Sequence, residues 1–170
     1  MMDMDFLICG FLIIFMLHNL EEIIAIEKWL KQTYPKKKEE IPLFLQKEID
    51  EVKDMTAVQF SIVVFIVSVF ASLIIIISLI TEQYVLFIGL NMFFALNIFT
   101  HPIQSLLLRC YTPGVWTSLL LIIPYNVLFF NYVYTEGLLT SSTLLGALIV
   151  FVSAIPVLLL SHKVAKKVVS

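Results

Sequence analysis

The segment Phe6–Trp29, FLICGFLIIFMLHNLEEIIAIEKW, decides how the rest of the chain is interpreted. It is almost entirely apolar, and as a helix it exceeds the about 20 residues needed to cross a bilayer. His18, Glu21 and Glu22 stand in its middle. Helix residues three and four apart share a face, so both carboxylates lie on the face of the histidine. A charged side chain at the centre of a membrane helix costs at least about 2.5 kcal/mol, and the cluster therefore predicts a functional site.

The composition is that of a membrane protein. The chain has 170 residues, of which 60% are hydrophobic and 14% charged, with a mean hydropathy of +0.98. Soluble domains average about 45–50% apolar and about 25% charged residues. We therefore expect a multi-pass protein of the cell membrane. The net charge of −2 gives no indication of a nucleic-acid partner. The acidic start, MMDMD, lacks the basic residues of a cleavable signal, so the first apolar run is expected to be a retained helix.

Five stretches have the length and apolarity of membrane helices, which predicts an all-α bundle forming one transmembrane domain over residues 1–170. They lie at about 6–30, 57–80, 84–108, 114–134 and 141–161. Pro35 and the lysines after it are expected to end the first helix. Between Pro42 and Thr56, apolar residues recur at helical spacing. That pattern predicts a short amphipathic helix at the membrane interface or an extension of the second span.

The basic residues indicate the orientation of this bundle. With five spans, all 11 lysines and arginines fall on one side. They are Lys28, Lys31, Lys36, Lys37, Lys38, Lys47, Lys53, Arg109, Lys163, Lys166 and Lys167. Positive loops stay in the cytoplasm, which places the N-terminus outside and the C-terminus inside.

The middle helices also carry polar side chains. In the second span, Ser61, Ser68 and Ser72 are small residues of the kind that lets membrane helices pack closely. In the third span, Asn97 and His101 lie four residues apart on one face. Pro102 follows the histidine and is expected to kink the helix near Ile98.

The rise of a helix gives the depth of these groups. At about 1.5 Å per residue, His18 and Glu22 lie roughly 15 Å and 9 Å from the cytoplasmic boundary. His101 lies roughly 12 Å from the same boundary, and Asn126 of the fourth span, counted from Trp116, roughly 15 Å. Three helices are therefore expected to bring their polar side chains to a similar level. A network that only fixes helix packing is the structural alternative.

The spelling His18-Asn19-Leu20-Glu21-Glu22 resembles the HXXEE family of small polytopic membrane proteins. The later Asn97 and His101-Pro102 are similar to polar positions that accompany the motif in that family. The resemblance implies a shared architecture over most of the chain. It implies no reaction and no catalytic role for any residue.

Two kinds of chemistry fit the cluster. Imidazole and carboxylate groups on neighbouring helices bind divalent metals such as zinc, iron or manganese. Metal-free acid–base catalysis is the alternative. The expected metal ligands are His18, Glu21, Glu22 and His101. The expected catalytic residues are Glu21, Glu22, Asn97 and Asn126, with the two asparagines orienting ligands, substrate or water.

We expect a membrane-embedded enzyme that acts on a lipid or other hydrophobic small molecule. The first alternative is a proton- or cation-coupled transporter with the same residues as an ion relay. Five helices cannot form an even inverted repeat, although a homodimer would restore the symmetry. The second alternative is a non-catalytic membrane assembly subunit.

Overall fold

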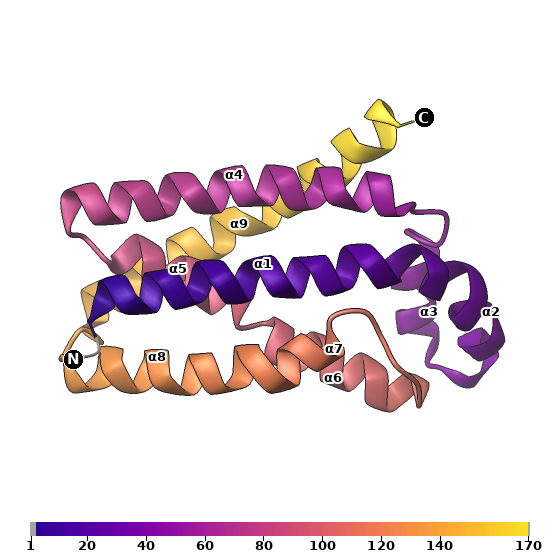
Figure 1. Ribbon diagram of the computed structural model, residues 1–170, viewed down its shortest axis with the longest axis horizontal. Helices are drawn as coiled ribbons and strands as arrows, with labels where there is room; N and C mark the ends of the chain where they lie inside the picture. The colour runs from indigo at the N-terminus through magenta and orange to yellow at the C-terminus, as the bar shows by residue number, and fades with distance from the viewer. Residues whose placement is uncertain (1–2, 170) are drawn as a thin grey trace.

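A computed structural model describes residues 3–169, and every regular element in that range is helical (Figure 1). Five helical segments are long and apolar enough to cross a membrane. They are Met4–Glu40, Ala57–Thr81, Val85–Leu108, Val115–Thr135 and Ser141–Val168. The predicted all-α architecture with five membrane-length helices is therefore confirmed. Successive segments run in opposite directions along the long axis of the bundle.

The first segment continues past the predicted end. Helix α1 (Met4–Lys28) runs into a π turn (Trp29–Thr33), then into α2 (Tyr34–Lys37) and a 3-10 turn (Lys38–Glu40). The expectation that Pro35 ends the helix is wrong. Pro35 stands in the first turn of α2, where its fixed φ suits a helix start. The preceding π turn bonds the Tyr34 N–H to the Trp29 carbonyl, five residues back.

A small second core holds this end of α1 in place. Helix α3 (Leu43–Asp50) folds back and buries its apolar face against it. The cluster consists of Trp29, Leu30, Tyr34, Ile41, Leu45, Ile49, Met55 and Leu108. Residues 51–56 separate α3 from α4 (Ala57–Thr81), so α3 is a helix of its own and not an extension of the second span.

The third segment is broken, and the break precedes the kink expected near Ile98. Helix α5 (Val85–Phe94) ends at a turn over residues 95–96, and α6 (Asn97–Leu108) continues with Pro102 inside it. The two halves pack against different partners. Helix α5 contacts α4 and α9 (Ser141–Val168), whereas α6 contacts the start of the fourth segment. The break lets each half follow its own neighbour.

The fourth segment begins irregularly. It consists of α7 (Val115–Thr117), a π turn (Ser118–Ile122) and α8 (Ile123–Thr135). The Ile123 N–H bonds to the Ser118 carbonyl, five residues back, directly before Pro124. The wider turn accommodates a proline that lacks its own N–H. Helix α8 then packs Tyr125, Phe129 and Val133 into the main core, together with Phe11 of α1 and Phe87 of α5.

The basic parts of the chain gather at one end of the bundle. Figure 1 shows α2 and α3, the end of α6 and the end of α9 at the end opposite the N label. Arg109 directly follows α6, and Lys166 and Lys167 lie in the last turn of α9. The arrangement in space therefore groups the cationic segments as the five-span count requires.

Substitution of Gly89 should loosen the contact between α5 and α9. A Cβ added at Gly89 would meet the Ala147 carbonyl oxygen at 2.5 Å and the Val150 Cβ at 2.7 Å. Gly89→Ala should therefore lower the free energy of unfolding by about 1–3 kcal/mol, the usual range for overpacking. The measurement is the thermal unfolding midpoint in detergent.

Gly10→Ala is the matched control. A Cβ at Gly10 would meet only the Tyr125 ring, at an ordinary 3.5 Å. That variant should be neutral or more stable by up to about 1 kcal/mol, because alanine is the better helix former. Equal midpoints for the two variants would contradict the close contact between α5 and α9.

Candidate metal centre

Three side chains from two helices converge within the membrane-length segments. His18 and Glu22 lie one turn apart on α1, and His101 comes from α6. One Glu22 oxygen, Oε1, lies 3.4 Å from His101 Nε2, and the other, Oε2, lies 3.8 Å from His18 Nε2. One potential ligand atom from each of the three residues lies within 4.8 Å of the others. The structure thus brings together the three residues whose depths had been estimated as similar.

The two distances from Glu22, 3.4 Å and 3.8 Å, are close to the separation of neighbouring ligands around a divalent metal ion. Zinc bonds of about 2.1 Å in a tetrahedron separate neighbouring ligand atoms by about 3.4 Å. A set of two histidines and one glutamate leaves a fourth position open, as in catalytic zinc sites. His18 is 1% exposed, and its Nε2 is a buried nitrogen without a hydrogen-bond partner among the described residues. The three residues present could therefore hold a metal ion.

Glu21 makes a different set of contacts from Glu22. Its Oε2 accepts hydrogen bonds from the Thr117 N–H at 2.8 Å and the Thr117 hydroxyl at 2.6 Å. Its Oε1 accepts from the Tyr111 hydroxyl at 2.9 Å and the Trp116 N–H at 3.3 Å. Glu21 therefore satisfies the first N–H groups of the fourth segment, where a carboxylate is favourable. It lies outside the group formed by His18, Glu22 and His101.

The same hydrogen bonds determine which nitrogen of His18 carries the proton. Thr117 has one hydroxyl proton, and the Glu21 carboxylate, which only accepts, takes it. His18 Nδ1 lies 2.8 Å from that hydroxyl oxygen and must then be the donor. His18 Nε2 keeps its lone pair, directed toward Glu22. Partners of this kind orient the metal-binding histidines of many proteins.

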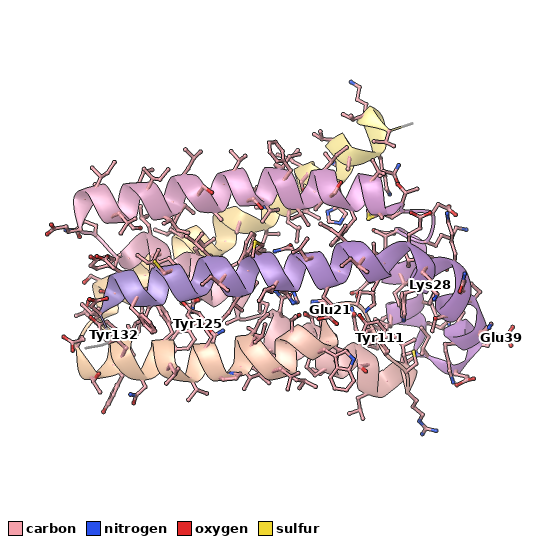
Figure 2. All side chains as sticks on the ribbon, in the orientation of Figure 1. Glu21, Lys28, Glu39, Tyr111, Tyr125 and Tyr132 are labelled. Atoms are coloured by element: carbon pink, nitrogen blue, oxygen red, sulfur yellow. The ribbon has the colours of Figure 1, made fainter. Side chains whose placement is uncertain are left out.

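Tyr111 extends this network toward the basic end of the bundle. It lies between the third and fourth segments and is 39% exposed. Burial, with the hydrogen bond to Glu21, raises the pKa of the Tyr111 hydroxyl above its ordinary value, so the hydroxyl stays a donor. The Trp29 indole donates to the Tyr111 carbonyl at 2.6 Å and ties this loop to α1. Figure 2 shows Glu21 and Tyr111 between α1 and the start of the fourth segment.

Gly114 brings the loop backbone against both imidazoles. Its φ is +85°, which disfavours residues with a side chain. A Cβ there would lie 2.8 Å from His101 Cε1 and 2.9 Å from His18 Cε1. The loop thus closes one side of the histidine pair, and the edge-on ring of Phe94, 5.6 Å from His18, lies on another. Gly114 is a site residue because of its lack of a side chain.

The two predicted asparagines lie elsewhere. Asn126 accepts a hydrogen bond from Asn91 at 2.9 Å and donates to the Ile122 carbonyl, inside the main core. Asn97 begins α6 and makes no side-chain hydrogen bond among residues 3–169. The depth estimate for Asn126 does not hold. Thr117 already lies beside His18, and Asn126 lies nine residues, roughly 13 Å, farther from the basic end of the bundle.

The physical reason for this error is the loop after α6, which returns into the bundle before the fourth segment begins (Figure 1). Trp116 therefore does not mark the membrane boundary. Sequence reasoning missed Tyr111, Gly114 and Thr117 for the same reason. The only sequence signal for these residues was the turn pair Pro113-Gly114 beside polar residues. A hydropathy profile does not distinguish that pattern from an ordinary loop.

A family model described as a protein of unknown function with HXXEE motif matches residues 9–129, more than half of the chain. The chain belongs to the HXXEE family. No curated protein and no solved structure matches it. The match includes the candidate ligands and Thr117 and ends before α9. In this HXXEE protein the histidine and second glutamate of the motif, His18 and Glu22, face His101, while the first glutamate, Glu21, holds the fourth segment.

Removal of the Thr117 hydroxyl should destabilise the HXXEE protein. Thr117→Val keeps the shape but leaves His18 Nδ1 without its partner and Glu21 with one hydrogen bond fewer. The free energy of unfolding should fall by about 1–3 kcal/mol. The measurement is the thermal midpoint in detergent. Thr117→Ser keeps the hydroxyl and should stay close to wild type, whereas a valine variant as stable as wild type would refute the network.

Proposed function

We propose that this HXXEE protein is a membrane-embedded enzyme whose reaction centre is a divalent metal held by His18, Glu22 and His101. The observation that supports it is the convergence of the three side chains within 4.8 Å inside membrane-length helices. Imidazole and carboxylate ligands suit zinc, iron or manganese. Glu21 is left out of the expected ligand set, because its oxygens accept hydrogen bonds from Thr117, Trp116 and Tyr111.

A bound divalent metal supplies Lewis-acid chemistry or a water of lowered pKa. His18, Glu22 and His101 would hold such a metal ion. Glu22 lies between the two imidazoles and provides the negative charge. Glu21 acts through Thr117 to fix the ring of His18. Gly114 and Phe94 enclose the imidazoles and limit the access of water.

The surroundings of the site favour a lipid or other apolar substrate. On α1, the faces beside His18 and Glu22 present Leu17, Leu20 and Ile24, which are 40%, 44% and 79% exposed. In a bilayer these surfaces meet hydrocarbon. A substrate dissolved in the membrane reaches the site without crossing the headgroup region.

A cation-coupled transporter is the second candidate, and the broken third segment favours it. Discontinuous helices commonly form ion sites near the middle of membrane transporters. Here the break at residues 95–96 separates α5 from the helix that carries His101. Metal uptake into proteoliposomes, absent in His101→Ala, would favour transport over catalysis.

We further propose that the protein lies in the cell membrane with its N-terminus outside and its basic end in the cytoplasm. Tags in the loop 31–56 and after Ser170 should both report the cytoplasm, and a tag before Met1 should report the exterior. Met1 and Ser170 lie outside the described residues. The measurement is protease or alkylation accessibility in intact cells. A loop tag and a C-terminal tag on opposite sides would refute this topology.

Metal content tests the reaction centre directly. Protein purified without chelator or metal-affinity resin should contain close to one divalent metal per chain by elemental analysis. His18→Ala, Glu22→Gln and His101→Ala should each lose it, and a second substitution should add little, because the three act as one site. At a metal concentration about 100-fold above Kd, binding should stabilise the fold by about 2.7 kcal/mol.

His162→Ala is the matched control for these variants. His162 lies on α9 near the basic end, and its Nδ1 is 2.9 Å from the Leu158 carbonyl. The control should keep its metal and its thermal midpoint. Wild-type protein that lacks metal and remains active in chelator would refute the metal centre and leave Glu22 and the histidines as acid–base groups.

A further inference from the structure

A groove of about 260 Å³ lies between α1 and α4. It is lined by Leu12, Phe15, Met16, Asn19, Leu20, Ile23, Val64, Ser68, Ala71 and Ser72. The two helices run beside each other in Figure 1 and are in contact. Ser68, Ala71 and Ser72 are small residues of the kind that usually lets helices approach. Here the small side chains of α4 instead leave space opposite the large side chains of α1.

The depth of the groove limits what can occupy it. Asn19 is nine residues from Lys28, roughly 13 Å, and Ser68 is eleven residues from Ala57, roughly 16 Å. Both therefore lie near the middle of a hydrocarbon layer about 30 Å thick. At that level the surrounding solvent is lipid chains. The volume exceeds the about 150 Å³ of an apolar cavity that holds benzene, so the groove has room for part of one hydrocarbon chain.

One polar atom in the groove, the side-chain oxygen of Asn19, remains available to a ligand. The Asn19 amide donates to the Phe15 carbonyl at 2.6 Å, and the Ser68 hydroxyl donates to the Val64 carbonyl at 2.7 Å. Among residues 3–169, the side-chain oxygen of the half-buried Asn19 has no hydrogen-bond partner. Polar groups without partners are costly in hydrocarbon. A ligand hydroxyl would satisfy the Asn19 oxygen, because it can donate a hydrogen bond to it.

One aromatic residue, Phe94, separates the wall of the groove from the candidate metal centre. Phe15 forms part of its wall, and the Phe15 ring lies 5.5 Å from the ring of Phe94. Phe94 in turn lies edge-on to His18 at 5.6 Å. Asn19 and His18 are consecutive on α1, so one residue faces the groove while the next faces His101. Two aromatic rings thus connect the groove wall to a candidate ligand.

We propose that this groove binds the hydrocarbon chain of the substrate, a single-chain lipid that carries a hydroxyl group. This inference rests on the proposed function, because it assigns a substrate class to the same site. The apolar lining takes the chain, and the Asn19 side-chain oxygen accepts a hydrogen bond from its hydroxyl. The chain then lies along α1 beside the face that carries His18 and Glu22.

Photolabelling of the full-length protein in phosphatidylcholine vesicles tests the assignment. The probe is a long-chain alcohol with a diazirine in its chain, and labelled peptides are mapped by mass spectrometry. Label should concentrate on residues 12–23 and 64–72. Excess unlabelled long-chain alcohol should compete, whereas an alkane of the same length should compete weakly. Ser72→Leu places extra methyl groups in the groove and should reduce labelling about tenfold.

Ser61→Leu is the matched control on the same helix. Ser61 does not line the groove, and its hydroxyl bonds to the Val58 carbonyl, so labelling should remain at the wild-type level. Label spread evenly over the lipid-facing helices, or unchanged in Ser72→Leu, would refute the groove. Metal analysis of the same samples separates the two proposals. Normal metal without specific labelling overturns only the groove, and specific labelling without metal overturns only the metal centre.

Discussion

The carboxylate of Glu21 carries the interaction on which the rest of the site depends. It accepts four hydrogen bonds, from Tyr111, Trp116 and the amide and hydroxyl of Thr117. A carboxylate inside a membrane-length helix must find donors, and the start of another helix offers unpaired N–H groups. The contact therefore fixes where the fourth segment begins. It also places the Thr117 hydroxyl against His18.

The irregular backbone of this protein follows from that contact. A straight fourth helix starting at the basic end of the bundle would carry Thr117 away from Glu21. Instead the loop after α6 returns into the bundle, passes the two imidazoles at Gly114 and leads into α7 and a π turn. The break between α5 and α6 frees the helix that carries His101 to follow this segment. Non-regular backbone at membrane depth is tolerated where it is buried in protein, as it is here.

Two apolar clusters lie on either side of His18, Glu22 and His101 along the bundle. The main core, around Phe11, Phe87 and Phe129, lies toward the N-terminal end of α1. The smaller core around Trp29 and Leu45 lies beyond its other end. The polar residues between them are held from both sides. A rigid setting of this kind suits a metal centre, whose ligands must keep their geometry.

The sequence by itself determined the all-α class, the number of membrane-length helices and the likeness to the HXXEE family. Those features depend on local apolarity, on segment length and on residues adjacent in the chain, and each can be read without knowing any contact. The similar depths of His18, Glu22 and His101 were also accessible, because helical rise is constant. The tertiary structure alone decided that Glu21 and Glu22 face different partners and that Thr117, not Asn126, meets His18. Helix rotation and the path of the returning loop depend on packing between segments far apart in the chain, and no local pattern encodes them.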